Sequence, residues 1–131
     1  MINGKPLILA VDDEENIRNL ITYTFEEHNL EVMTAENGKA AITILENNPI
    51  DVIITDLLMP TMTGLALIRE MKKRKSAIPI IIITAYGNTE MVKEIIAEGV
   101  FRLIEKPLDF DILVPIVQDA IENKKKNKNS K

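Results

Sequence analysis

Five short apolar runs recur along this chain of 131 residues and restrict what it can fold into. They are rich in β-branched residues and do not alternate with polar ones, which is typical of strands buried on both faces of a parallel sheet. The runs are Leu7–Val11, Leu30–Thr34, Val52–Thr55, Ile80–Thr84 and Phe101–Ile104. Because segments with helical spacing lie between them, the sequence predicts a doubly wound α/β fold of five β–α units.

The predicted helices follow the apolar runs in turn. We expect them around Ile17–Phe25, over Lys39–Asn47, from about Gly64 to Arg74, over Thr89–Glu98, and after Asp109. No second domain or internal repeat precedes residue 124. We therefore expect one domain at 1–123, followed by a lysine-rich tail or the start of a linker at 124–131.

The charge distribution makes the body of the chain acidic. Five of the 16 Lys and Arg residues lie in the last eight positions, so residues 1–123 hold 11 basic and 20 acidic residues, a net charge of −9. Affinity for nucleic acid comes largely from Lys and Arg, so this body is poorly suited to bind it. The chain also begins without the apolar core of a signal peptide and has no run as long as a membrane span. We expect a cytoplasmic protein with no nucleic-acid or membrane partner.

The residue types available limit the chemistry. The chain has no cysteine and a single histidine, His28. Disulfides, zinc–thiolate centres, iron–sulfur clusters and cysteine nucleophiles are therefore excluded, as is a multi-histidine metal site within one chain. Any metal must be a hard cation on oxygen ligands.

Five polar residues stand just beyond the predicted strands. Parallel strands in such a fold end at one edge of the sheet, where ligands bind. The five are Asp12 and Asp13 after the first run, Asp56 after the third, Thr84 at the end of the fourth and Lys106 beyond the fifth. Three of them have ordinary alternatives when taken alone: Asp13 as a helix cap, Thr84 as a strand-end hydroxyl and Lys106 as a solvated cation. Asp56 is harder to dismiss, because it follows a buried strand, where an unpaired carboxylate is costly. Their convergence on one edge is what indicates a site.

The chemistry of that site follows from its charges. Clustered carboxylates repel one another unless a cation lies among them, and Mg²⁺ prefers carboxylate, water and phosphate oxygens. A lysine adds a point charge for a phosphoryl group. The residues are thus suited to present a carboxylate nucleophile to phosphorus and to form an aspartyl phosphate.

Four segments with this spacing and order resemble the receiver domain of bacterial two-component response regulators. They are AVDDE (10–14), IITDLLMPTMTG (53–64), IIITAYG (81–87) and IEKPL (104–108). The resemblance covers residues 7 to about 122. It implies a flavodoxin-like fold with strand order 2-1-3-4-5.

The resemblance also implies roles for the residues at the edge. Asp56 matches the phosphoacceptor, Asp13 the direct Mg²⁺ ligand and Asp12 the neighbour that helps to hold the metal. The main-chain carbonyl of Leu58 falls at the position that completes the protein ligands. Lys106 matches the lysine that pairs first with the acceptor and then with the phosphoryl oxygens.

Four further positions bear on the switch. Thr84 matches the switch hydroxyl, and Pro107 stands where receivers usually have a cis Lys–Pro peptide. Tyr86 occupies a position that governs the access of hydrolytic water. Leu103 departs from the pattern, because receivers usually carry Tyr or Phe there. Phe101 is a substitute only by proximity, two residues earlier and on the same side if the strand alternates.

The resemblance implies a signalling domain that catalyses only its own phosphorylation and dephosphorylation. Its expected partners are a sensor histidine kinase and a downstream effector or fused output domain, and phosphorylation-dependent homodimers are one form of output.

Three other protein classes remain as alternatives. A haloacid-dehalogenase-like Mg²⁺-dependent phosphatase also uses Asp, Thr and Lys, but its nucleophile lies in a DxD motif after the first strand, where this chain reads Asp12-Asp13-Glu14. A flavodoxin-like electron carrier needs a phosphate-binding loop that these acids would disfavour. A histidine phosphotransfer domain would use His28, but it is a helical bundle without buried strands.

Overall fold

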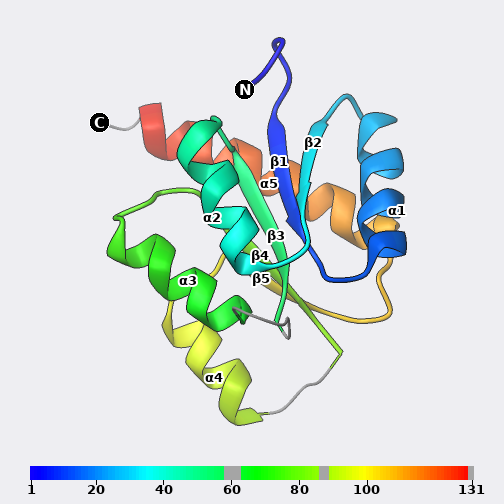
Figure 1. Cartoon of the computed structure of the whole chain (residues 1–131). Helices are drawn as coiled ribbons and strands as arrows, with labels where there is room; N and C mark the ends of the chain where they lie inside the picture. The colour runs from blue at the N-terminus through cyan, green and yellow to red at the C-terminus, as the bar shows by residue number, and fades with distance from the viewer. Residues whose placement is uncertain (58–62, 86–88, 130–131) are drawn as a thin grey trace.

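The chain folds into alternating strands and helices (Figure 1), and the computed structural model describes residues 1–57, 63–85 and 89–129. The predicted positions Leu58 and Tyr86 lie outside these ranges. The elements are β1 (Leu7–Val11), α1 (Glu15–Glu26), β2 (Glu31–Ala35), α2 (Gly38–Asn47), β3 (Val52–Asp56), α3 (Gly64–Lys73), β4 (Ile80–Thr84), α4 (Thr89–Ala97), β5 (Arg102–Glu105) and α5 (Phe110–Asn129). The predicted doubly wound α/β fold is confirmed.

The five strands form one parallel sheet in the order β2-β1-β3-β4-β5. Strands β1, β3 and β4 are buried along their whole length, as the continuous apolar runs predict. In the register of the sheet, Asp56 at the end of β3 lies beside Ile83 of β4, and Thr84 lies beside Glu105 of β5. The polar residues that follow these strands therefore share one edge.

Two apolar layers hold the helices against the sheet. On one face, Leu7, Leu9 and other strand residues pack against side chains of α2, α3 and α4. On the other face, Ile8 and Ala10 pack against α1 and α5, including Phe25. Figure 1 shows the same division, with α2, α3 and α4 on one side of the sheet and α1 and α5 on the other. Among the described residues, no helix combines the length and apolarity needed to cross a bilayer.

The segment around β5 differs from our expectation in one respect. Leu103 packs against the layer shared with α2, α3 and α4, whereas Phe101 packs against the layer shared with α5. The two side chains thus lie on opposite faces, and the prediction that they share a side is wrong. The reason is that β5 begins at Arg102, so Phe101 precedes the strand and does not follow its alternation.

The α5 helix continues to Asn129, beyond residue 123 where the sequence places the end of the domain. The backbone is therefore helical through most of the lysine-rich segment.

Gly64 joins the start of α3 to the end of β3. Its N–H donates to the carbonyl of Leu57 at 2.8 Å. A Cβ atom at this position would lie 2.7 Å from the carbonyl oxygen of Asp56 and 3.0 Å from the Cα of Leu57. Both are main-chain atoms, so the site requires glycine because of this close approach.

We predict that Gly64→Ala lowers the free energy of unfolding by about 2 kcal/mol, because the strand end or the helix start must shift to relieve the overlap. Urea denaturation followed by circular dichroism measures this. Gly99→Asn is the matched control: Gly99 has φ +85° with open space around it, and Asn tolerates that conformation, so its effect should be much smaller. Equal losses in both variants would contradict the close-approach argument.

Candidate functional site

Four side chains gather at the edge of the sheet where the strands end. Asp12 follows β1, Asp56 ends β3, Thr84 ends β4, and Lys106 follows β5. The first three are buried, with exposed fractions of 3%, 8% and 1%. Asp13, next to Asp12, is exposed. The convergence predicted from the strand ends is therefore present. It places the charged side chains of Asp12 and Asp56 in a largely buried position.

Lys106 and Asp56 form an ion pair across this edge. The Lys106 ammonium lies 2.9 Å from Oδ2 of Asp56. The main chain fixes the start of the lysine side chain, because the Lys106 N–H donates to the carbonyl of Thr84 at 2.7 Å. The Lys106–Pro107 peptide bond is cis, the geometry that the resemblance implies. Residues 50 positions apart are thus brought into direct contact.

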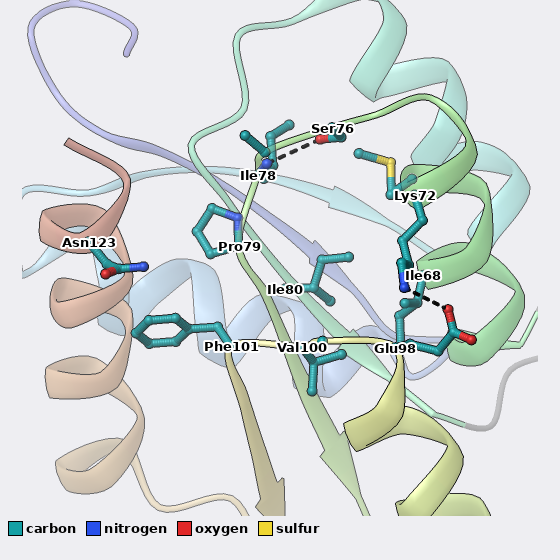
Figure 2. Close-up of a pocket in the computed structure, with 13 residues that line it drawn as sticks. Ile68, Lys72, Ser76, Ile78, Pro79, Ile80, Glu98, Val100, Phe101 and Asn123 are labelled. Atoms are coloured by element: carbon teal, nitrogen blue, oxygen red, sulfur yellow. Dashed lines mark hydrogen bonds and ion pairs between the residues drawn. The ribbon is translucent and has the colours of Figure 1, made fainter. Parts of the chain in front are cut away.

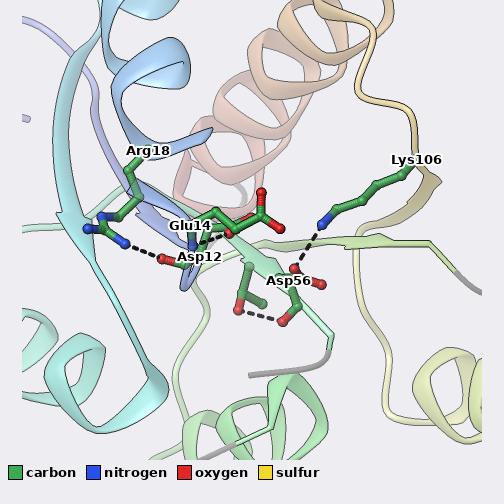
Figure 3. A network of polar contacts seen from close by, with 6 residues as sticks. Asp12, Glu14, Arg18, Asp56 and Lys106 are labelled. Atoms are coloured by element: carbon green, nitrogen blue, oxygen red, sulfur yellow. Dashed lines mark hydrogen bonds and ion pairs between the residues drawn. The ribbon is translucent and has the colours of Figure 1, made fainter. Parts of the chain in front are cut away.

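Asp12 is held by three hydrogen bonds. Its N–H donates to the carbonyl of Ala35 at 3.1 Å, and its Oδ1 accepts from the N–H of Glu14 at 2.8 Å. Its main-chain carbonyl accepts from Nη1 of Arg18 at 2.8 Å. Figure 3 shows Arg18 on one side of Asp12, with Asp56 and Lys106 on the other. The backbone and the side chain of Asp12 are therefore both fixed.

Asp12, Asp13 and Asp56 each place a carboxylate oxygen within 4.8 Å of the other two. Carboxylates this close favour a cation between them, and three oxygen donors suit Mg²⁺. The alternative of Asp13 as a helix cap is not what the structure shows: the N-cap of α1 is Glu14, which makes no side-chain capping bond. The carboxylate of Asp13 instead lies beside those of Asp12 and Asp56.

The surroundings of Asp12 favour its protonated form. Burial raises the pKa of this carboxyl, and the negative charges of Asp56 and Asp13 raise it further. The hydrogen bond from Glu14 and the positive charge of Lys106 lower the pKa but do not compensate fully. A bound divalent cation would reverse the balance by stabilising the carboxylate form.

The same carboxylates favour the charged form of Lys106. Partial burial lowers the pKa of its ammonium, but the hydrogen bond to Asp56 and the attraction of Asp56, Asp12 and Glu14 outweigh it, so the pKa is raised. Lys106 therefore remains a cation at neutral pH, as neutralising charge on a phosphoryl group requires.

Sequence reasoning did not identify two contacts of the site. Arg18 lies six positions after Asp12 and carries no motif, although a basic residue one turn into the helix after an acidic pair is a weak signal. Thr55, fully buried, donates from Oγ1 to the carbonyl of Asp56 at 3.0 Å. Neither contact could be predicted, because both depend on the distance between main-chain carbonyls and side chains in the folded chain.

A separate hollow of about 220 Å³ opens at the other end of β4 and β5, before the strands begin (Figure 2). Apolar side chains such as Ile78, Val100 and Phe101 line it. Its two charged residues, Lys72 and Glu98, form an ion pair of 3.4 Å with each other. The chemistry therefore concentrates at the carboxylate edge and not in this hollow.

Known proteins are similar to this chain in sequence and in fold. The response regulator receiver domain family matches residues 8–118. The regulatory protein AtoC of Escherichia coli K12 is 36% identical over 115 residues, which are 88% of this chain and 25% of AtoC. The DNA-binding transcriptional regulator NtrC of Salmonella typhimurium is 32% identical over 89% of the chain and 25% of NtrC. The chain thus spans about a quarter of the length of these relatives.

A solved structure is also similar to this chain. The crystal structure of a response regulator receiver domain protein from Clostridium thermocellum has a TM-score of 0.85 and 34% identity to this chain. The similarity covers 92% of this chain and 97% of that one. The likeness therefore extends over most of this chain and nearly all of that one.

We predict that Asp12→Asn stabilises the protein by about 1 kcal/mol at neutral pH without divalent cations, a typical size for one favourable charge change. Since the folded-state pKa of Asp12 is raised above its ordinary value of 3.8, the folded protein binds the proton more tightly, and the ionised form costs stability. The gain in the variant should be absent below that value, grow as the pH rises from it through the raised pKa, and be constant above the raised pKa. Urea unfolding at several pH values in EDTA measures it; a gain that does not change with pH would contradict the assignment.

Proposed function

This chain belongs to the response regulator receiver domain family, and from that membership we propose that Asp56 accepts a phosphoryl group from a phosphohistidine of a sensor kinase. The observation that carries the proposal is the ion pair between Lys106 and Asp56 beside two further carboxylates. It joins a nucleophile, a fixed cation and oxygen ligands for a metal at one point. Family membership makes this a signalling domain, and we infer that phosphorylation alters its contacts.

The transfer follows from the positions of these groups. A carboxylate oxygen of Asp56 attacks phosphorus as the bond from phosphorus to the histidine nitrogen breaks, and the nitrogen keeps the bonding electron pair. The product is an acyl phosphate on Asp56 and a free imidazole on the kinase. Lys106, already 2.9 Å from Oδ2, needs to move little to contact a phosphoryl oxygen. Its charge then offsets the charge that the aspartate gains.

Mg²⁺ is the cofactor that the donor set fits. Asp12, Asp13 and Asp56 would hold it, and a bound cation would offset the burial and the neighbouring acids that raise the pKa of Asp12. When bound, Mg²⁺ neutralises charge on the transferring oxygens. The carbonyl of Leu58, a further ligand implied by the family pattern, lies outside the described residues.

Output is proposed to pass through Thr84 to the face formed by α4, β5 and α5. Thr84 is 1% exposed, and its carbonyl accepts from the N–H of Lys106, whose side chain contacts Asp56; a change at Asp56 therefore reaches the residue that follows β5. Helices α4 and α5 expose Ile96 and Ile112, apolar side chains that a partner can cover. The partner would be an output domain, an effector protein or a second phosphorylated copy.

No observation favours the alternative of a haloacid-dehalogenase-like phosphatase. Such an enzyme would place its nucleophile after β1, but the lysine contacts Asp56 at the end of β3. The family match over residues 8–118 supports the receiver instead.

We predict that acetyl phosphate or a phosphorylated kinase adds one phosphoryl group to the protein, only with Mg²⁺ present, and adds none to Asp56→Asn. The reason is that an amide cannot act as the nucleophile. Intact-mass spectrometry measures the product. Asp51→Asn is the control, because Asp51 lies at the opposite end of β3, beside the start of β1. Equal labelling of Asp56→Asn and wild type would contradict the assignment.

We also predict that Thr84, and not Leu103, couples the site to the α4–β5–α5 face. Backbone NMR shifts with and without beryllofluoride, a phosphoryl mimic, report the coupling. Thr84→Ala should remove most of the shift changes on that face, because its hydroxyl is the group that reaches the phosphoryl oxygens. Leu103→Ala should leave them largely intact, since a leucine lacks the ring and hydroxyl that exchange partners. Loss of the response in Leu103→Ala alone would reverse this assignment.

A further inference from the structure

Arg18 reaches back from the first turns of α1 to the end of β1. Its Nη1 donates to the main-chain carbonyl of Asp12 at 2.8 Å. Strand β1 ends at Val11, so this carbonyl lies beyond the last strand residue. In Figure 3 the guanidinium lies on the side of Asp12 away from Lys106. Arg18 therefore contacts the acidic loop through its backbone.

That contact holds a carbonyl of the peptide that joins Asp12 to Asp13. The N–H and the side chain of Asp12 are already held by Ala35 and Glu14. The remaining freedom is rotation of the peptide between Asp12 and Asp13, which would turn the Asp12 carbonyl and displace the Asp13 carboxylate. A guanidinium is always charged and presents a rigid, planar set of donors, which suits it to fix one carbonyl direction.

We propose that Arg18 is a positioning residue for the cation site: by holding the Asp12 carbonyl, it keeps the Asp13 carboxylate beside those of Asp12 and Asp56. The inference rests on the proposed function, because it assigns Arg18 a part in holding the Mg²⁺ that phosphoryl transfer uses. Hydrogen bonds that orient the ligands of a metal without touching it typically change metal affinity by 10- to 100-fold.

If Arg18 acts through its charge, its removal should change the Mg²⁺ affinity in one direction; if it acts by positioning, in the other. Removing a positive charge near a cation site should strengthen Mg²⁺ binding through electrostatics alone. Removing a contact that orders the ligands should weaken it. The direction of the change in affinity therefore separates the two roles.

The experiment is calorimetric titration of the whole chain with MgCl₂. We expect Arg18→Gln to bind Mg²⁺ about tenfold more weakly than wild type, with Arg18→Lys in between because it keeps a donor but not the planar fork. Arg102→Gln is the matched control. Arg102 also donates a guanidinium N–H to a main-chain carbonyl, that of Phe101 at 3.2 Å, but it lies at the start of β5, away from the carboxylate edge. Its loss changes the net charge equally and should leave Mg²⁺ affinity unchanged.

Phosphorylation by acetyl phosphate supplies the second measurement. For Arg18→Gln, the Mg²⁺ concentration that gives half the maximal rate should rise about tenfold, while the rate at saturating Mg²⁺ stays close to that of wild type. A loss of global stability alone would not produce this separation.

Unchanged or tighter Mg²⁺ binding by Arg18→Gln would overturn the inference. If that variant does not fold by circular dichroism, Arg18→Lys decides, and wild-type affinity in it would overturn the inference as well. Failure of the wild-type chain to bind Mg²⁺ would instead contradict the proposed function, so the two failures are distinguishable.

Discussion

Two carboxylates, Asp12 and Asp56, lie buried at one edge of a parallel sheet, and the arrangement around them follows from the cost of keeping charge there. Lys106 offsets part of that cost through its 2.9 Å contact with Asp56. The remainder is visible as the raised pKa of Asp12, to which burial and the neighbouring acids contribute. A site that retains excess negative charge in this way is suited to a divalent cation and to the phosphoryl group that the cation accompanies.

The same edge is held by main-chain contacts that leave little room for adjustment. Gly64 lies so close to the Asp56 carbonyl that a side chain cannot be added without movement. The carbonyl of Thr84 and the N–H of Lys106 join β4 to the lysine at 2.7 Å. The side chain of Lys106 contacts Asp56 while its N–H bonds to Thr84, so the proposed phosphoryl group on Asp56 would act on the ends of β4 and β5 together. This is the proposed physical basis for a signal that leaves the site.

Leu103, which stands where receivers usually carry Tyr or Phe, bears on how a signal would leave the site. Leu103 packs against the layer that includes Ile95 of α4, whereas Phe101 lies on the α5 side. No aromatic ring of β5 therefore stands behind Thr84 on the α4 side. The proposed coupling passes through the threonine and the main chain, which needs only small movements in a closely packed edge.

The sequence by itself determined the five strands, the five helices and the convergence of Asp12, Asp13, Asp56, Thr84 and Lys106, because apolar periodicity and strand-end positions are local properties of the chain. The resemblance to receivers extended this to roles for those residues. Tertiary structure alone decided which face Phe101 packs on, why Gly64 admits no side chain, and which cation holds the Asp12 carbonyl. Each of these depends on distances between atoms far apart in the chain or on where a strand begins, and these emerge only when the sheet and helices have packed.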